Sequence, residues 1–203
     1  MRTHDRRPRL RLAEKLDISV DQLSELVFGG ESGLAAQSGK IPIAEHWRTV
    51  GARLGLEPEA LPEFRREFFA GDVLDSELVN ALTALRPRYQ TVLISNAFAD
   101  LRETVLAPYH LDLVFDHLII SGEIGWMKPD PHIYLTALQA CAAAPAEAVL
   151  VDDILKNVQG AREVGMQAIL FQNTTQTLNK LQLMLNPEIS HLPPRTSHLT
   201  LDP

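Results

Sequence analysis

Several common features are scarce in this sequence of 203 residues. It has one cysteine, Cys141, so no intramolecular disulfide can form, and its seven histidines show no Cys/His spacing of zinc type. No apolar run approaches the roughly 18 residues that a membrane-spanning helix needs, and the charged N-terminus lacks the apolar stretch of a signal peptide. These absences predict a cytoplasmic location in a reducing compartment.

Positive charge is also in short supply. The chain has 19 Lys and Arg against 26 Asp and Glu, a formal net charge of −7. A general attraction to nucleic acid or to an anionic membrane is therefore not expected. The hydrophobic content of 45% and the charged content of 22% are typical of one globular unit, with at most a small second lobe.

The first part of the chain, residues 1–86, shows helical apolar spacing and nothing that resembles a strand. Ser19 is placed to cap a helix over 20–28, and the glycine-rich stretch 28–33 predicts a turn. Further amphipathic segments lie at 43–54, 58–70 and 75–85. We expect a bundle of four or five short helices.

Short apolar runs alternate with helical stretches from about residue 90 onward. The runs are 91–94, 118–120, 148–151 and 168–171, and the helix candidates are 98–106, 131–143, 154–164 and 174–185. Near-continuous apolar runs are typical of parallel strands covered on both faces, so the pattern predicts α/β architecture in a doubly wound arrangement. Residues 186–203 hold four prolines and no periodic pattern, and we interpret them as an irregular tail.

Polar residues follow three of the four apolar runs, and ligands of parallel sheets lie beyond the carboxyl ends of their strands. Ser95 and Asn96 come directly after the first run, where backbone N–H groups favour an anion. Lys128 lies after the second run, where it can place one positive charge beside a phosphate. Asp152 and Asp153 follow the third run, and such paired carboxylates suit Mg²⁺. Each has a plainer interpretation, as a helix cap or a solvated charge.

Together these residues resemble a known family. Ser95-Asn96, then the segment Lys-Pro-Asp-Pro-His-Ile-Tyr that begins at Lys128, then Asp152-Asp153 with Asn-Val-Gln-Gly-Ala-Arg-Glu-Val-Gly after it, resemble the second, third and fourth motifs of the haloacid dehalogenase (HAD) superfamily. The resemblance covers about 88–172, and the helices before it resemble the cap of subfamily I. It implies a Rossmann-like HAD core with a parallel sheet over 87–185, preceded by a helical cap region over 1–86.

The resemblance also implies an activity. Members are most often Mg²⁺-dependent phosphatases of small phosphorylated metabolites. By this analogy Ser95 hydrogen-bonds the transferring phosphoryl group, Lys128 stabilises that group and the nucleophile, and Asn96 positions the loop. Asp153 would bind Mg²⁺ directly, and Asp152 would support the metal through water or orient the site.

One motif of the family has no match. The first motif is an apolar strand that ends in the nucleophilic Asp, and it should precede the cap. Asp5 follows no apolar run, and Asp72 and Asp75 lie in the helical region, so we identify no nucleophile. The family places this strand between the strands of the second and fourth motifs, and its absence would leave their backbone groups unpaired. We therefore expect a phosphatase lineage with impaired or absent turnover.

Two other interpretations and one explanation remain. One alternative is a non-catalytic phosphate-binding or regulatory protein, which the absent nucleophile favours. The other is a 2-haloacid dehalogenase, which shares the Ser-Asn and Lys motifs but needs no metal. The paired carboxylates argue against the dehalogenase, because a metal-free site gains little from two adjacent like charges.

We expect Met1 to be an internal methionine of a longer reading frame. Substrate identity and oligomeric state do not follow from the sequence.

Overall fold

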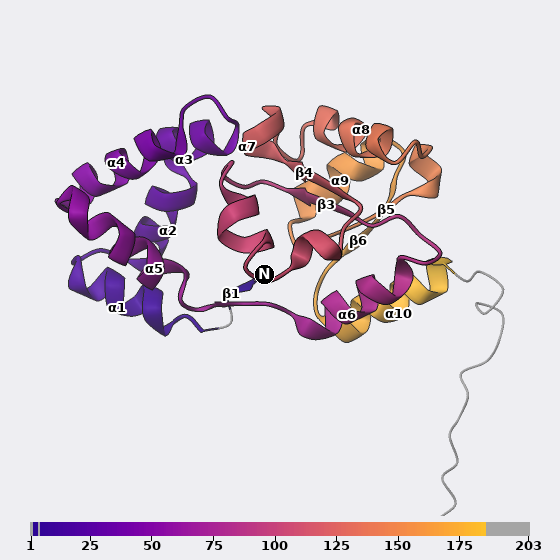
Figure 1. The fold of residues 1–203 in the computed structure, drawn as a ribbon, viewed down its shortest axis with the longest axis horizontal. Coiled ribbons are helices and arrows are strands. Elements are labelled where there is room, and N and C mark those ends of the chain that lie inside the picture. The colour runs from indigo at the N-terminus through magenta and orange to yellow at the C-terminus, as the bar shows by residue number, and fades with distance from the viewer. Residues whose placement is uncertain (1, 4, 186–203) are drawn as a thin grey trace, which may run out of the picture.

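The computed structural model describes residues 2–3 and 5–185, so the expected tail at 186–203 lies outside the described residues. Helices make up one lobe, coloured indigo to purple in Figure 1. They are α1 (Arg7–Lys15), α2 (Val20–Phe28), α3 (Gly30–Gln37), α4 (Ile43–Leu54) and α5 (Leu61–Phe69). None of the described helices has both the length and the apolar character that crossing a membrane requires.

The second lobe alternates strands and helices (Figure 1). Its strands are β3 (Val92–Ser95), β4 (His117–Ile120), β5 (Val149–Asp152) and β6 (Gln167–Leu170). Its helices are α6 (Ser76–Leu85), α7 (Ser121–Ile124), α8 (Pro131–Ala140), α9 (Leu155–Glu163) and α10 (Thr174–Leu185). Short 3₁₀ turns lie at Pro58–Ala60, Leu111–Leu113 and Pro145–Glu147. The expected mixture of helices and short parallel strands is confirmed.

The strands pair in twos. β3 pairs with β4 and β5 pairs with β6, each in parallel, with Ser95 opposite Ile120 and Asp152 opposite Leu170 at the carboxyl ends. The described strands include no ladder between β3 and β5. Parallel pairing of consecutive strands requires a crossover connection. The segment with the short turns at Arg102–Leu106 and Leu111–Leu113 connects β3 to β4, and α9 connects β5 to β6. Helix α8 lies between the two pairs in the chain.

The helical lobe has its own apolar core. Its largest wholly buried side chains are Leu23, Val27, Val50 and Phe68, with Trp47 at 4% exposure. These residues recur at the three- and four-residue spacing of α2, α4 and α5, so each helix turns one apolar face inward. Capping fixes the ends: Ser19 Oγ accepts from the Gln22 amide at 3.1 Å, and the Gln22 side chain accepts from the Ser19 amide at 2.8 Å.

The glycine-rich stretch at 28–33 is not the turn that its composition predicts. The chain breaks only at Gly29 and then enters α3 at Gly30. Two side chains make this tight junction possible: the Glu25 carboxylate accepts from the Gly30 amide at 2.9 Å, and the buried Gln37 amide donates to the Phe28 carbonyl. Both partners lie outside the glycine stretch, and therefore its local composition did not reveal the helix.

The expectation that residues 1–86 contain no strand is also wrong. β1 (Arg2–Thr3) and β2 (Asp72–Val73) form a two-residue antiparallel pair beside the start of α1. Strands this short have no periodicity to detect. The Asp5 amide extends the contact by donating to the Gly71 carbonyl at 3.1 Å.

The helix expected at 98–106 is shorter than its pattern suggests. Only Arg102–Leu106 is helical, as one π-type turn. Phe98 is pulled out of that segment into the aromatic core of the helical lobe, where its ring lies 5.1 Å from His46 and 6.0 Å from Trp47. Tertiary contact has overridden local propensity here. A short α-helix, α7, occupies the start of the segment after β4.

Helix α6 packs with the second lobe. It lies beside α10 in Figure 1, and its Val79 and Leu82 pack on a cluster that contains Leu106 and Ile120. Asp75 caps α6 by accepting from the Leu78 amide and also accepts from the Thr174 hydroxyl on α10. The helical lobe and the α/β lobe are therefore joined by the segment that carries β2.

Candidate functional site

The ammonium group of Lys128 connects the ends of β3 and β5. It donates to the Ile94 carbonyl at 2.8 Å and to Asp152 Oδ2 at 2.7 Å. The two side chains are only 10% and 5% exposed, so this is a nearly buried ion pair. An ammonium group has three donors, and the structure uses two of them among the described residues. The third N–H is available to an anion at the same edge.

Asn96 fixes the backbone of that lysine. Its Oδ1 accepts from the Lys128 amide at 2.7 Å, and its Nδ2 donates to the Lys128 carbonyl at 2.8 Å. This two-way clamp joins residues that are 32 positions apart in the chain. The described contacts of the Asn96 side chain are thus to the loop that carries Lys128, and its expected role in positioning the site stays a prediction.

The Asp152 carboxylate is fully engaged. Oδ2 receives the Lys128 ammonium group, while Oδ1 accepts from the Ile154 amide at 2.8 Å and from Asn157 Nδ2 at 2.9 Å. Asn157 is 4% exposed and comes from the first turn of α9. Sequence reasoning assigned no role to Asn157. The signal was its position five residues after Asp152, where the first helical turn brings it back beneath the strand end.

Ser95 and Asp153 have the freer side chains at this edge. Ser95 is the last residue of β3 and Asp153 directly follows β5 on the exposed surface. Among the described residues, neither side chain has an assigned hydrogen bond or ion pair. The structure thus brings Asn96, Lys128 and Asp152 into direct contact and places Ser95 and Asp153 as their chain neighbours.

The carboxylates at this edge suit Mg²⁺ as ligands, but they do not by themselves surround a metal ion. Within residues 5–185 no group of three or more His, Cys, Asp or Glu side chains could hold a metal ion by itself. Magnesium commonly takes one or two carboxylates and completes its octahedron with water and phosphate oxygens. Asp153, exposed and with no assigned partner in this part of the chain, fits one such ligand, and Asp152 fits a supporting carboxylate because Lys128 already occupies one of its oxygens.

Helix α9 lies close against the lysine loop. A Cβ at Gly160 would be 2.8 Å from the Pro129 carbonyl oxygen, so only glycine permits this approach. Tyr134, wholly buried on α8, donates its hydroxyl to the Asn157 carbonyl at 2.8 Å. Burial, with the negative charge of Asp152 as a second cause, raises the pKa of Tyr134 to about 12, so its hydroxyl stays a donor.

The loop after β3 is held from the opposite side by α7. The buried Ser121 hydroxyl accepts from the Ala97 amide at 3.0 Å, and the Gly122 amide donates to the Ala97 carbonyl at 3.1 Å. Sequence reasoning placed no function on Ser121. The sequence gives little indication of this contact, because a serine after an apolar run is usually interpreted as a helix cap.

The three acidic residues considered as attacking groups are engaged elsewhere. Asp5 holds Arg7 through both carboxylate oxygens, and these hydrogen bonds lower the pKa of Asp5 to about 2. Asp72 pairs with Arg9 at 3.0 Å, and Asp75 caps α6. All three belong to the segments around α1, β2 and α6.

Comparison with known proteins gives a consistent picture. A family model described as haloacid dehalogenase-like hydrolase matches residues 5–165. The chain is 29% identical over 151 residues to bifunctional epoxide hydrolase 2 of Rattus norvegicus, covering 72% of this chain and 27% of the relative. It is 35% identical over 146 residues to phosphoserine phosphatase of Thermus thermophilus, covering 69% of this chain and 58% of the relative. The chain thus spans about a quarter of the epoxide hydrolase and little over half of the phosphatase.

A solved structure supports the same fold. A HAD family enzyme of Bacteroides thetaiotaomicron, in complex with magnesium and inorganic phosphate, superposes with a TM-score of 0.70 at 19% identity. The match covers 86% of this chain and 92% of that one. At this identity the likeness establishes the arrangement of helices and strands.

Proposed function

Because the chain belongs to the haloacid dehalogenase-like hydrolases, we propose that it descends from Mg²⁺-dependent phosphatases of small phosphorylated metabolites and retains their phosphate-binding edge. The observation that carries the proposal is the Lys128 ammonium group, which joins the ends of β3 and β5 and keeps one donor free. A fixed cation in a nearly dry place attracts a phosphoryl group more strongly than one in water. A cytoplasmic location and the cap boundary at residue 86 stay predictions.

Each residue of this edge receives one role in the proposal. Lys128 neutralises part of the phosphoryl charge, and the Ser95 hydroxyl donates a hydrogen bond to a phosphoryl oxygen. Asn96 and Asn157 hold Lys128 and Asp152 in place through the contacts described above. Asp153, supported by Asp152, would hold Mg²⁺, and the metal when bound would supply further neutralisation of the transferring group.

We further propose that these 203 residues bind phosphate without efficient turnover. The reaction of the lineage needs a carboxylate that attacks phosphorus in line, and a carboxylate can do so only from the carboxyl edge of the sheet. Asp5, Asp72 and Asp75 are committed to Arg7, Arg9 and the α6 cap, respectively. Support for the proposal comes from these contacts together with the missing ladder between β3 and β5.

The binding half of the proposal is tested by calorimetric titration with inorganic phosphate, with and without Mg²⁺. We expect Mg²⁺-dependent binding that weakens about tenfold or more in Ser95→Ala, since one charge-assisted hydrogen bond is worth about 1.5–3 kcal/mol. Ser24→Ala, a helical serine in the other lobe, is the matched control and should bind as the parent does. Equal binding by both variants would contradict the role of Ser95.

The catalytic half is tested with p-nitrophenyl phosphate. We expect this chain to release little phosphate in Mg²⁺. Robust turnover would overturn the proposed inactivity, while phosphate binding without turnover would favour the non-catalytic, regulatory interpretation.

A further inference from the structure

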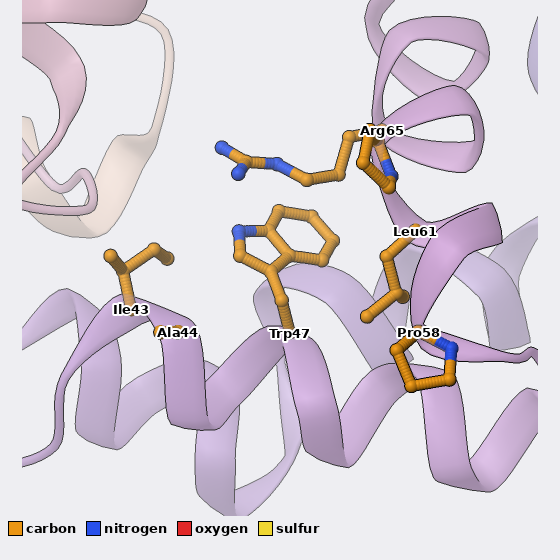
Figure 2. A pocket seen from close by; sticks show the side chains of 7 residues that line it. Ile43, Ala44, Trp47, Pro58, Leu61 and Arg65 are labelled. Atoms are coloured by element: carbon orange, nitrogen blue, oxygen red, sulfur yellow. The ribbon is translucent and has the colours of Figure 1, made fainter.

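The helical lobe contains a cavity that the phosphate edge does not explain. It has a volume of about 310 Å³ and lies between α4 and the start of α5, as Figure 2 shows. Six of its seven lining residues are apolar, among them Ile43, Ala44, Trp47 and Leu61. Cavities of this size lie at the small end of the range that holds small organic ligands, and apolar walls are their usual character.

The one charge in this cavity is already neutralised. Arg65 stacks over the Trp47 ring, with the guanidinium carbon 4.7 Å from the ring centroid, and its Nη2 donates to Asp100 Oδ2 at 2.8 Å. Asp100 belongs to the loop after β3, so the cavity wall is tied to the segment that begins at Ser95. A ligand with its own ammonium and carboxylate groups would find no free partner in this cavity and would lose hydration on entry.

Trp47 forms one wall of this cavity. The residue is 4% exposed, and Figure 2 shows the indole ring beneath the Arg65 guanidinium group. Its Nε1 has no hydrogen-bond partner among the described residues, and a hydrocarbon offers no acceptor to it. The contact that this wall offers to an apolar ligand is therefore packing against the ring.

A second cavity borders the loop that follows β3. It has a volume of about 260 Å³, shares Ile43 with the first, and is also lined by Lys40, Ala99 and Gly122. Gly122 is the residue whose amide donates to the Ala97 carbonyl, two positions after Ser95. The two cavities are therefore neighbours, and the second lies against the loop that begins at Ser95.

We propose that this pair of cavities receives the body of a phosphate monoester of an apolar alcohol, with the hydrocarbon against Trp47 and Leu61. This inference rests on the proposed function, because it assumes that the phosphoryl group lies at Ser95 and Lys128. It narrows the substrate class: the part of the alcohol that meets Trp47 is aliphatic or aromatic and uncharged, because the walls there are apolar and the one charge, on Arg65, is paired with Asp100.

The test compares three ligands by calorimetric titration in Mg²⁺: n-octyl phosphate below its micelle concentration, O-phosphoserine and inorganic phosphate. Each buried methylene group is worth about a fourfold gain in affinity. We expect n-octyl phosphate to bind at least tenfold more tightly than inorganic phosphate, and O-phosphoserine to show no such gain. Equal affinities for n-octyl phosphate and O-phosphoserine would overturn the inference.

A pocket-filling variant locates the effect. Ala44 is exposed on α4 and lines the cavity, so Ala44→Phe fills it without disturbing the buried core. We expect Ala44→Phe to lose the octyl preference while keeping its affinity for inorganic phosphate. Ala52→Phe is the matched control, because Ala52 is exposed on the same helix and lines neither cavity. An octyl preference that survives in Ala44→Phe would place the hydrocarbon elsewhere and sink the inference.

The two proposals fail separately. If inorganic phosphate does not bind, the proposed function fails, and the cavity is then tested with 1-octanol alone. Binding of 1-octanol that disappears in Ala44→Phe and persists in Ala52→Phe would still support an apolar ligand site. Absence of 1-octanol binding together with normal phosphate binding would reject the cavity and leave the phosphate edge intact.

Discussion

The ammonium group of Lys128 is shared between a backbone carbonyl at the end of β3 and a carboxylate at the end of β5. No ladder joins these two strands in the described part of the chain, so this side chain provides a direct link across the gap, and Asn96 holds the backbone of the lysine in place. A nearly buried ion pair is costly to break from one side, because the remaining charge loses its partner but stays out of water. Lys128 therefore has a structural role as well as its proposed chemical one.

Replacement of this lysine by a neutral side chain of similar length should destabilise the fold. We expect Lys128→Met to lower the free energy of unfolding by about 3–5 kcal/mol, because Asp152 keeps its burial and loses its counter-charge. Urea denaturation measures the change. Lys156→Met, at an exposed position of α9, is the control and should stay within about 0.5 kcal/mol. A loss below about 1 kcal/mol for Lys128→Met would mean that the pair is not buried in solution.

The contacts of Asp116 at the start of β3 predict how the stability of the chain depends on pH. Its carboxylate accepts from the Thr91 amide at 2.8 Å and pairs with Arg86, and these contacts lower its pKa from near 4 to about 2. A carboxyl group whose pKa is lowered by folding stabilises the native state above its unfolded pKa and loses that effect as the pH falls. The contribution of Asp116 should therefore be complete above about pH 5 and decline between pH 4 and pH 2.

The measurement is the urea midpoint of unfolding at pH 5 and at pH 2.5. We expect the difference between the two midpoints to be smaller in Asp116→Asn than in the parent chain. Asp112→Asn, an exposed acidic residue in the same loop region, is the control and should behave as the parent does. The same acid dependence in Asp116→Asn and the parent would refute the assignment.

At the scale of elements, α9 is fixed against the lysine loop by the absence of a side chain at Gly160. The nearest atom that a Cβ would meet is the Pro129 carbonyl oxygen at 2.8 Å, and a backbone atom cannot rotate away. Gly51 on α4 has a similarly close neighbour, Leu61 Cδ2 at 2.9 Å, but this atom ends a flexible side chain. The two glycines thus form a matched pair with opposite expectations.

We expect Gly160→Ala to destabilise the chain by about 1–3 kcal/mol and to weaken phosphate binding, because α9 or the Lys128 loop must shift. Gly51→Ala should change stability by no more than about 1 kcal/mol, since the helical propensity of alanine offsets the movement of Leu61. Urea denaturation and phosphate titration of both variants check this. A neutral Gly160→Ala would show that the loop adapts more easily than the close contact implies.

The whole molecule consists of a helical lobe and an α/β lobe that contact each other through Phe98 and one ion pair. Phe98 leaves the loop after β3 and enters the core of the helical lobe, and Arg65 pairs with Asp100 in the same loop. Arg9 of α1 pairs with Asp72 of β2, in the segment that connects the lobes, at side-chain exposures of 13% and 15%. The loop that carries the proposed phosphate contacts is therefore also the loop that anchors the helical lobe.

Ligand binding at that loop should raise the melting temperature of the whole chain. At ten times its dissociation constant a ligand adds about 1.4 kcal/mol, which corresponds to about 3–6 °C for a domain of this size. We expect that shift with phosphate and Mg²⁺ together and its reversal by EDTA, measured by differential scanning calorimetry. Asp153→Asn should lose the Mg²⁺-dependent part of the shift in melting temperature. A shift that EDTA does not reverse would argue against a metal at Asp153.

Much of this arrangement followed from local sequence. The helices at 20–28, 43–54 and 174–185 agree with their observed bounds because each combines apolar periodicity with a clear start or stop signal. The four short strands fall within one residue of the apolar runs that predicted them, since burial on both faces demands continuous hydrophobicity. Ser95, Asn96, Lys128 and the two aspartates could be singled out from the sequence because ligand-binding residues of parallel sheets follow strand ends, and their functional roles stay predictions.

The rest depended on contacts between distant residues. Helix α3 exists because Glu25 and Gln37 satisfy the backbone around Gly29, and no window of glycine-rich sequence contains that information. The roles of Asn157, Tyr134 and Ser121 appear only when α9, α8 and α7 meet the strand ends. Sequence indicated which polar groups gather at one edge, because each follows the end of an apolar run and the alternation of such runs with helical segments predicts parallel strands. Tertiary structure decided that Lys128 joins two separate strand pairs and that an apolar cavity adjoins them, because both arise only from packing across the chain.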